Sequence, residues 1–197
     1  MKKILLSTLM VCSLVPAYAT VFSYNVFLDG PSESPANASP GTGTASVIYN
    51  DTAHTLFIDM VFSGLLGTTT ASHIHAATAS PGTLTAGVAT TTPTFAGFPL
   101  GVTSGSYSVT LDMTLASSYN PAYVSANGGT PATAEVALAS AMAAGKSYLN
   151  IHTSVFGGGE IRGFLTPVPE PTTLALVGLG GLGMAMLAHN KKRASKL

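Results

Sequence analysis

Charged side chains are scarce in this chain of 197 residues: only 8% are Asp, Glu, Lys or Arg, whereas 46% are hydrophobic. A soluble domain usually carries about 25% charged residues, so the composition is not that of a typical cytosolic enzyme. Residues 20–166 contain two cationic side chains against seven anionic ones, a net charge of −5, and the other cations lie at the two ends. An acidic body without a basic patch excludes nucleic acid as a partner.

Cysteine is almost absent, and the single one, Cys12, lies in a predicted secretory signal peptide at residues 1–19. This segment has two lysines, an apolar run and an Ala17-Tyr18-Ala19 cleavage site, in the order that signal peptides use. The run is shorter than the roughly 20 residues that span a bilayer, although a retained N-terminal anchor is the alternative. Removal of the signal leaves a domain without a thiol, a disulfide or a thiolate metal ligand.

Long hydrophobic runs are also rare, and the second one follows the motif Pro169-Glu170-Pro171. We predict a transmembrane segment over residues 172–188, followed by a basic tail. Its apolar core, residues 174–188, covers about 22 Å as a helix, against a hydrocarbon thickness of about 30 Å, so the anchor is marginal. Positive residues stay in the cytoplasm, which predicts that the domain lies outside.

Between these two signals, residues 20–166 are rich in Thr, Ser and Gly, with short apolar alternations between turn residues. Such a pattern favours an all-β domain, an antiparallel β-sandwich or barrel. The predicted strands, which include two hairpins, are residues 22–28, 43–49, 55–62, 107–113, 148–153 and 160–165. One short helix is predicted over residues 131–144, because Pro131 and Gly145 occupy the positions that those residues prefer at helix ends.

Histidine is the one chemically distinctive residue of the domain. Residues 72–75 predict a strand on which His73 and His75 point to the same face, with Ile74 turned into the core. The same alternation turns Asn150 and His152 outward on a later strand.

These segments resemble a known family. Residues 71–75, 148–153 and 159–163 together are similar to the CHRD domain, which is named for repeats in chordin and is common in exported bacterial proteins. Residues 28–35 fit the N-terminal pattern of that family. The resemblance implies an all-β extracellular fold without a settled biochemical activity, with Asn150, Glu160 and Arg162 as parts of its motifs.

The C-terminal segment, residues 167–197, resembles the PEP-CTERM sorting signal of Gram-negative bacteria, with Pro169, Glu170 and Pro171 in the recognition box. That resemblance implies processing by an exosortase-type enzyme at the inner membrane and delivery to the cell surface or the extracellular matrix. Such proteins are often linked to extracellular polysaccharide. A plain C-terminal anchor is the alternative.

Three neutral imidazoles, those of His73, His75 and His152, can form a mononuclear copper or zinc site. The alternative is that they hydrogen-bond to backbone or carboxylate groups across the sheet. His54, in a predicted turn, is not expected to join them. A copper-zinc dismutase is excluded, because its dinuclear site needs about six histidines and the domain has four.

Glu160 and Arg162 are two residues apart on one predicted strand. They can pair with each other or with neighbouring charges, or Arg162 can be buried and clamp a loop through carbonyl oxygens. A general-base couple of Glu160 with His152 is a further alternative, but nothing in the sequence specifies a substrate. We therefore expect a non-catalytic surface or matrix domain, with metal binding as the alternative and an enzyme as the least favoured hypothesis.

Overall fold

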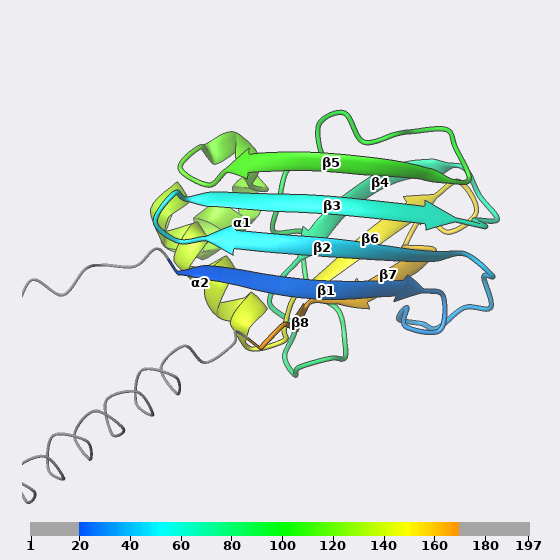
Figure 1. Ribbon diagram of the computed structural model, residues 1–197, viewed down its shortest axis with the longest axis horizontal. Helices are drawn as coiled ribbons and strands as arrows, with labels where there is room; N and C mark the ends of the chain where they lie inside the picture. The colour runs from blue at the N-terminus through cyan, green and yellow to red at the C-terminus, as the bar shows by residue number, and fades with distance from the viewer. Residues whose placement is uncertain (1–19, 170–197) are drawn as a thin grey trace, which may run out of the picture.

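Residues 20–169 are described by the computed structural model, and they form a curled antiparallel sheet with two helices at one end (Figure 1). The strands are β1 (Val21–Asp29), β2 (Thr42–Asn50), β3 (Thr55–Ser63), β4 (Thr69–His75), β5 (Gly105–Asp112), β6 (Tyr148–Thr153), β7 (Ile161–Phe164) and β8 (Thr166–Pro167). Their order is β4-β6-β7-β1-β2-β3-β5, and β8 also pairs with β1. This arrangement confirms the predicted all-β antiparallel class.

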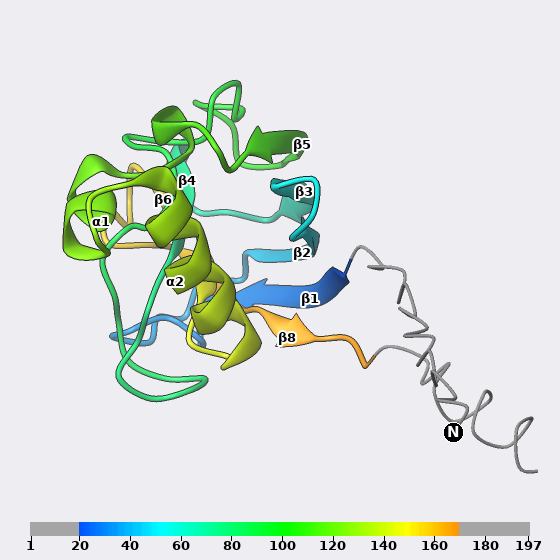
Figure 2. The same cartoon turned by 90° about the vertical axis from the view of Figure 1, so that its left-hand side faces the viewer.

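The sheet folds over on itself into two layers. Strands β1, β2, β3 and β5 form one layer, and β4, β6 and β7 lie behind them in Figure 1. The turned view shows β4 and β6 apart from the first layer (Figure 2). A single registered pair, Asp29 with Arg162, joins β1 to β7 at the fold between the layers. Fully buried side chains from both layers fill the space between them, including Val47, Ile58, Ile74, Leu149 and Ile151.

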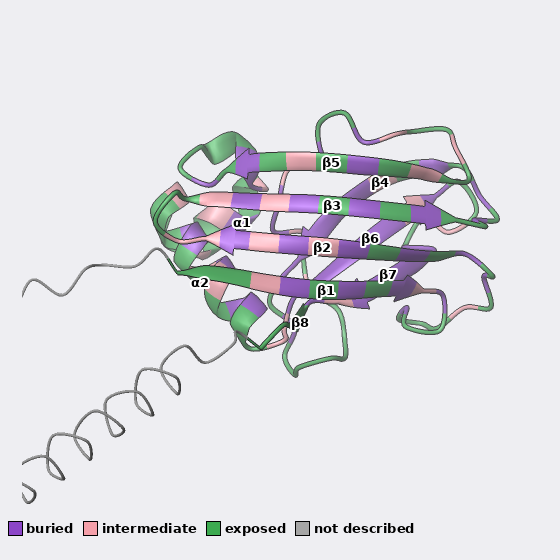
Figure 3. Ribbon diagram, viewed as in Figure 1, coloured by how far each residue is buried: buried purple, intermediate pink, exposed green. Residues whose placement is uncertain are grey.

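The strands are where the alternation of the sequence predicts them. In β3, Leu56, Ile58 and Met60 are buried whereas Asp59 is exposed. Figure 3 shows the same alternation of buried and exposed positions along the neighbouring strands. Both predicted hairpins are present as the β2–β3 and β6–β7 pairs.

The predicted helix is present as α2 (Pro131–Ala143), but the structure corrects the expectation of a single helix. Thr130 caps α2 in a capping box, and Gly145 follows its end at a φ of 65°. A second short helix, α1 (Pro121–Ala126), precedes it and is capped by the Asn120 side chain. Six residues are too few for a helical hydrophobic period, so only the cap could have signalled α1.

The long segment between β4 and β5 covers the outer edge of β4. Ala89 and Phe95 donate backbone hydrogen bonds to the carbonyls of Ile74 and Ser72, and Gly101 donates to that of Thr69. These bonds satisfy the β4 edge and fix the loop beside the histidines of that strand.

Neither end of the chain is described. The predicted signal peptide, residues 1–19, and the predicted transmembrane segment, residues 172–188, lie outside the described residues. Within residues 20–169, neither helix has the length and apolar character needed to cross a bilayer.

We expect Gly163→Ala to destabilise the fold severely. A Cβ at Gly163 would clash with the carbonyl oxygen of Phe27 and lie 2.7 Å from its carbonyl carbon. Backbone cannot give way there without separating β7 from β1, so the free energy of unfolding should fall by about 3 kcal/mol or more. Thermal or denaturant unfolding measures the loss. The matched control is Gly157→Ala, whose Cβ meets nothing within 4 Å; equal stability of the two variants would contradict the prediction.

Candidate metal centre

The register between β4 and β6 brings the three predicted histidines together. His73 pairs with Asn150, and His75 pairs with Tyr148, so His152 stands beside His73 on the next strand. The ring centroid of His73 lies 4.8 Å from that of His75 and 4.7 Å from that of His152. Ile74 is fully buried on the opposite face, as the alternation predicts.

Three ring nitrogens, one from each histidine, lie within 4.8 Å of one another. The closest two, Nε2 of His73 and Nε2 of His152, are 2.9 Å apart. Nitrogens bound to one zinc ion at about 2.0–2.1 Å can be at most about 4.2 Å apart, so small side-chain rotations suffice to close the set on an ion. The group found within residues 20–169 contains no carboxylate.

Backbone carbonyls orient two of the imidazoles. Nδ1 of His75 lies 2.9 Å from the Ala86 oxygen, and Nδ1 of His152 lies 3.0 Å from the Gly157 oxygen. A carbonyl only accepts, so each Nδ1 carries the proton and each Nε2 presents its lone pair. Nε2 of His75 is buried without a hydrogen-bond partner in the described part of the chain. Metal-binding histidines are usually oriented in this way, by a hydrogen bond from the ring nitrogen that does not bind the metal.

Burial keeps these imidazoles neutral. Desolvation lowers the pKa of His73 to about 3, helped by the neighbouring histidines, and the pKa of His75 to about 4. The pKa of His152 is also lowered by burial, against the hydrogen bond to Gly157. Neutral imidazole is the form that binds a metal ion.

The close contact between His73 and His152 has one other chemical reading. If Nε2 of His73 is protonated, it can donate to Nε2 of His152 in a plain hydrogen bond. His73 Nδ1 is then an unprotonated acceptor, and it is buried without a partner among the described residues. A bound cation and a bridging proton thus compete for the same two lone pairs.

Arg162 is buried and acts as a clamp between loops. Its Nε donates to the carbonyl of Ser32, and its Nη1 donates to that of Leu84 at 3.0 Å. Arg162 Nε also lies 3.9 Å from a carboxylate oxygen of Glu33, whereas no ion pair with Glu160 is formed. Of the arrangements open from the sequence, the geometry is that of the loop clamp.

Glu160 is fully buried and its carboxylate is saturated with hydrogen bonds. One oxygen accepts from the Ser39 hydroxyl and the Leu66 amide, both at 2.6 Å; the other accepts from the Thr153 hydroxyl at 2.7 Å and the Gly67 amide at 3.0 Å. Burial raises the pKa of Glu160, but the four hydrogen bonds outweigh it and hold the pKa below its usual value. The group is therefore an ionised structural anchor.

Asn150 departs from the expectation that it points outward to solvent. The loop after β1 covers it, and its side-chain oxygen is buried without a partner in the described residues. Glu33, on that loop, brings an equally unpartnered carboxylate oxygen to the same place, since both oxygens are 2.6 Å from a Cβ built on Gly159. Desolvation raises the pKa of Glu33 to about 7, against the attraction of Arg162. In its protonated form the Glu33 carboxyl group can donate a hydrogen bond to the amide oxygen of Asn150.

His54 lies in the β2–β3 turn and does not join the cluster, as expected. Its Nδ1 instead contacts both carboxylate oxygens of Glu135 on α2, at 3.0 and 3.1 Å. Tyr49 donates to the same carboxylate at 2.9 Å. No local pattern can indicate this contact, because 81 residues separate His54 from Glu135.

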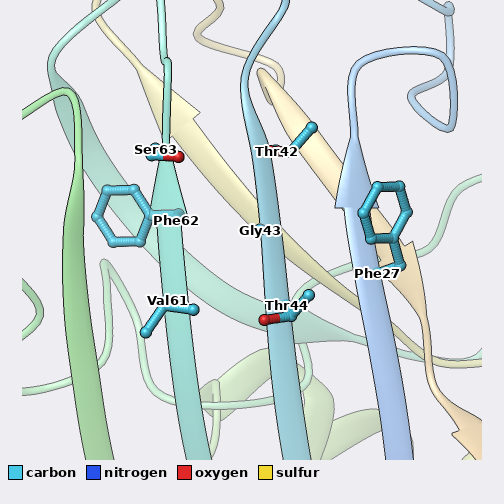
Figure 4. Close-up of a pocket in the computed structure, with 7 residues that line it drawn as sticks. All are labelled: Phe27, Thr42, Gly43, Thr44, Val61, Phe62 and Ser63. Carbon is cyan, nitrogen blue, oxygen red and sulfur yellow. The ribbon is translucent and has the colours of Figure 1, made fainter.

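A shallow hollow on the outer face of β1, β2 and β3 offers no comparable chemistry (Figure 4). Phe27 and Val61 project on either side of Thr44, and no titratable side chain lines the hollow. Of the predicted sorting motif, Pro169 is exposed at the end of the described chain, and Glu170 and Pro171 lie outside the described residues.

We expect Glu160→Gln to lower the free energy of unfolding by about 2–3 kcal/mol, because the new amide group faces donors that need an acceptor. The deficit should shrink as pH falls below about 4.5, since a depressed pKa adds stability above the ordinary value and loses it as the wild-type carboxylate is protonated. Denaturant titrations from pH 7 to pH 3 measure both effects. Asp59→Asn, which neutralises an exposed carboxylate, is the control; a deficit independent of pH would contradict the account.

Comparison with known proteins agrees with the two resemblances. The CHRD domain matches residues 24–165, and the PEP-CTERM protein-sorting motif matches residues 167–192. No curated protein and no solved structure matches the chain. The sorting motif indicates export and processing by an exosortase-type enzyme at the membrane before release to the cell surface. Since the domain match covers most of the chain, this protein belongs to the CHRD domain family.

Proposed function

We propose that this exported CHRD-domain protein is a non-catalytic surface module that binds one copper or zinc ion through His73, His75 and His152. The observation that carries the proposal is the convergence within 4.8 Å of three ring nitrogens, from the buried His73 and His75 and the half-buried His152. In His75 and His152, a carbonyl at Nδ1 leaves the Nε2 lone pair free. Three neutral nitrogen ligands without a thiolate or a carboxylate suit copper and zinc. For one such site the divalent copper ion binds more tightly than zinc.

The surroundings of the cluster favour binding over catalysis. Both oxygens of Glu160 are occupied by four donors, which leaves no carboxylate lone pair poised as a general base for His152. The other nearby carboxylate, Glu33, is buried beside Arg162. Three protein ligands leave one position of a tetrahedral ion open, where water or an external donor can bind.

A role in the extracellular matrix is the second part of the proposal. Export and sorting carry the domain to the outside, and its strands present many Thr and Ser side chains there. Hydroxyl-rich, weakly charged surface suits contact with extracellular polysaccharide. Delivery of a bound metal ion to that setting, or its retention there, is compatible with a passive module.

The test is calorimetric titration of the metal-free protein with Cu(II) and with Zn(II). We expect one ion per chain. Affinity should fall in His152→Ala by at least the roughly 10–100-fold that is typical when a hydrogen-bond partner of a ligand is lost, and binding should be abolished when all three histidines are alanine. Binding should also raise the midpoint of thermal unfolding, because the ion binds only the folded state.

The matched control is His54→Ala, which removes a histidine outside the cluster and should leave the affinity unchanged. Equal binding by the wild type and the triple alanine variant would rule out the site. Absence of binding together with a large loss of stability in the triple variant would assign the histidines to the hydrogen-bonded alternative.

A further inference from the structure

An uncharged surface surrounds the point where the chain leaves the domain. The Val168 amide donates to the Ser23 carbonyl at 2.8 Å, which seats the last described residues against the start of β1. One hollow there is lined by Phe22, Ala143 and Val168, together with their neighbours, and a second one by Phe22, Ser140 and their neighbours. We call this surface the exit rim; its members are Phe22, Ala139, Ser140, Ala143, Pro167 and Val168.

The exit rim is apolar where a soluble domain normally carries charge. No charged residue lines either hollow. Phe22 and Val168 are each more than one third exposed, and Val136 on α2 is 67% exposed. The only charged residue of α2, Glu135, is buried, so the outer face of this helix consists of small and apolar side chains. A surface helix usually turns charged residues outward, which makes this face unusual for one exposed to water.

The chain itself limits how far the exit rim can lie from a membrane. Both described ends leave the domain side by side at this rim, next to β8 and α2 (Figure 2). From Pro169 to Leu174, where the apolar run begins, the chain has five residues, at most about 18 Å when fully extended. The headgroup layer of one leaflet takes up about 5–7 Å of that distance. An unprocessed chain anchored by its C-terminal segment therefore holds the exit rim at the lipid surface.

We propose that the exit rim docks on the lipid surface while the protein awaits processing, with Phe22 and Val168 at the headgroup boundary. The proposal rests on the membrane-anchored processing described above and adds the face and the orientation. The net negative charge of the domain opposes approach to anionic lipid, so the uncharged rim is the face that can approach. Asp51, which accepts from the Thr20 amide at 3.1 Å, marks the border of that face.

Docking in this way turns the histidine cluster toward the outside. The paired residues run across the sheet from Asp29, at the far end of β1, to Arg162 on β7. From there they continue to Asn150 on β6 and His73 on β4. Seven residues of β1 separate Phe22 from Asp29, about 23 Å along the strand. The cluster thus lies away from the lipid surface during anchoring.

The experiment uses the unprocessed chain, from Thr20 to Leu197, in liposomes that contain a nitroxide-labelled lipid headgroup. A fluorophore is attached at Ser140→Cys in the rim, and for comparison at Gly158→Cys, where added atoms meet nothing within 4 Å. The domain has no native cysteine to interfere. We expect the nitroxide to quench the fluorophore at position 140 and to leave the fluorescence at position 158 unchanged. Phe22→Asp should restore the fluorescence at Ser140, whereas Phe27→Asp, the same change on the outer face of β1, should not.

Equal fluorescence at Ser140 and Gly158 in a chain that sediments with the liposomes would overturn the docking and leave the anchor intact. A chain that does not sediment with them would overturn both the anchor and the docking. A third outcome is quenching that appears only when the nitroxide is carried by other protein molecules instead of lipid, and that grows with protein density. It would show that the exit rim contacts a second copy of the domain and not the lipid surface.

Discussion

The hydrogen bonds to the buried Glu160 carboxylate hold together the two layers of the sheet, and the arrangement of the nearby loops depends on them. An ionised group in the interior is stable only when donors replace its water, and here four donors do so. They come from three separate segments: the chain before β2, the β3–β4 turn and strand β6. Removing the charge would leave all three without their common acceptor. The carboxylate is therefore a shared hydrogen-bond acceptor that links both layers.

The orientation of the histidine cluster depends on the Glu160 carboxylate through residues adjacent to both. Thr153, which donates to Glu160, follows His152 directly, and the chain from Thr153 to Glu160 forms the loop whose Gly157 carbonyl orients that imidazole. On the other side Arg162 holds the Leu84 carbonyl, and Ala86 of the same loop orients His75. The arginine also lies 4.7 Å from the centre of the Tyr148 ring, which stacks on His75. Two charged residues on one short segment thus support the orientation of both imidazoles.

The part of this arrangement that repeats with a period of two could be predicted from the sequence. Alternation alone placed His73 and His75 on one face with Ile74 beneath, and it located the strands that surround them. It could not show that Asn150 is buried, because the covering loop joins it from more than one hundred residues away. The partners of Glu160 were equally hidden, since Ser39 lies 121 residues away and Leu66 lies 94 residues away. Contacts of this kind follow from the curl of the sheet and not from local pattern.

The scarcity of charge also has a structural explanation in these contacts. Of the nine charged residues between positions 20 and 166, four are buried: Glu33, Glu135, Glu160 and Arg162. The domain uses almost half of its charges internally, as acceptors and donors that fix loops, and leaves a surface made mainly of hydroxyl and small apolar groups. Such a surface exerts little long-range attraction on any partner. Binding of a partner must then rely on contacts that form at short range and exclude water. The histidine cluster and the exit rim can both make contacts of this kind.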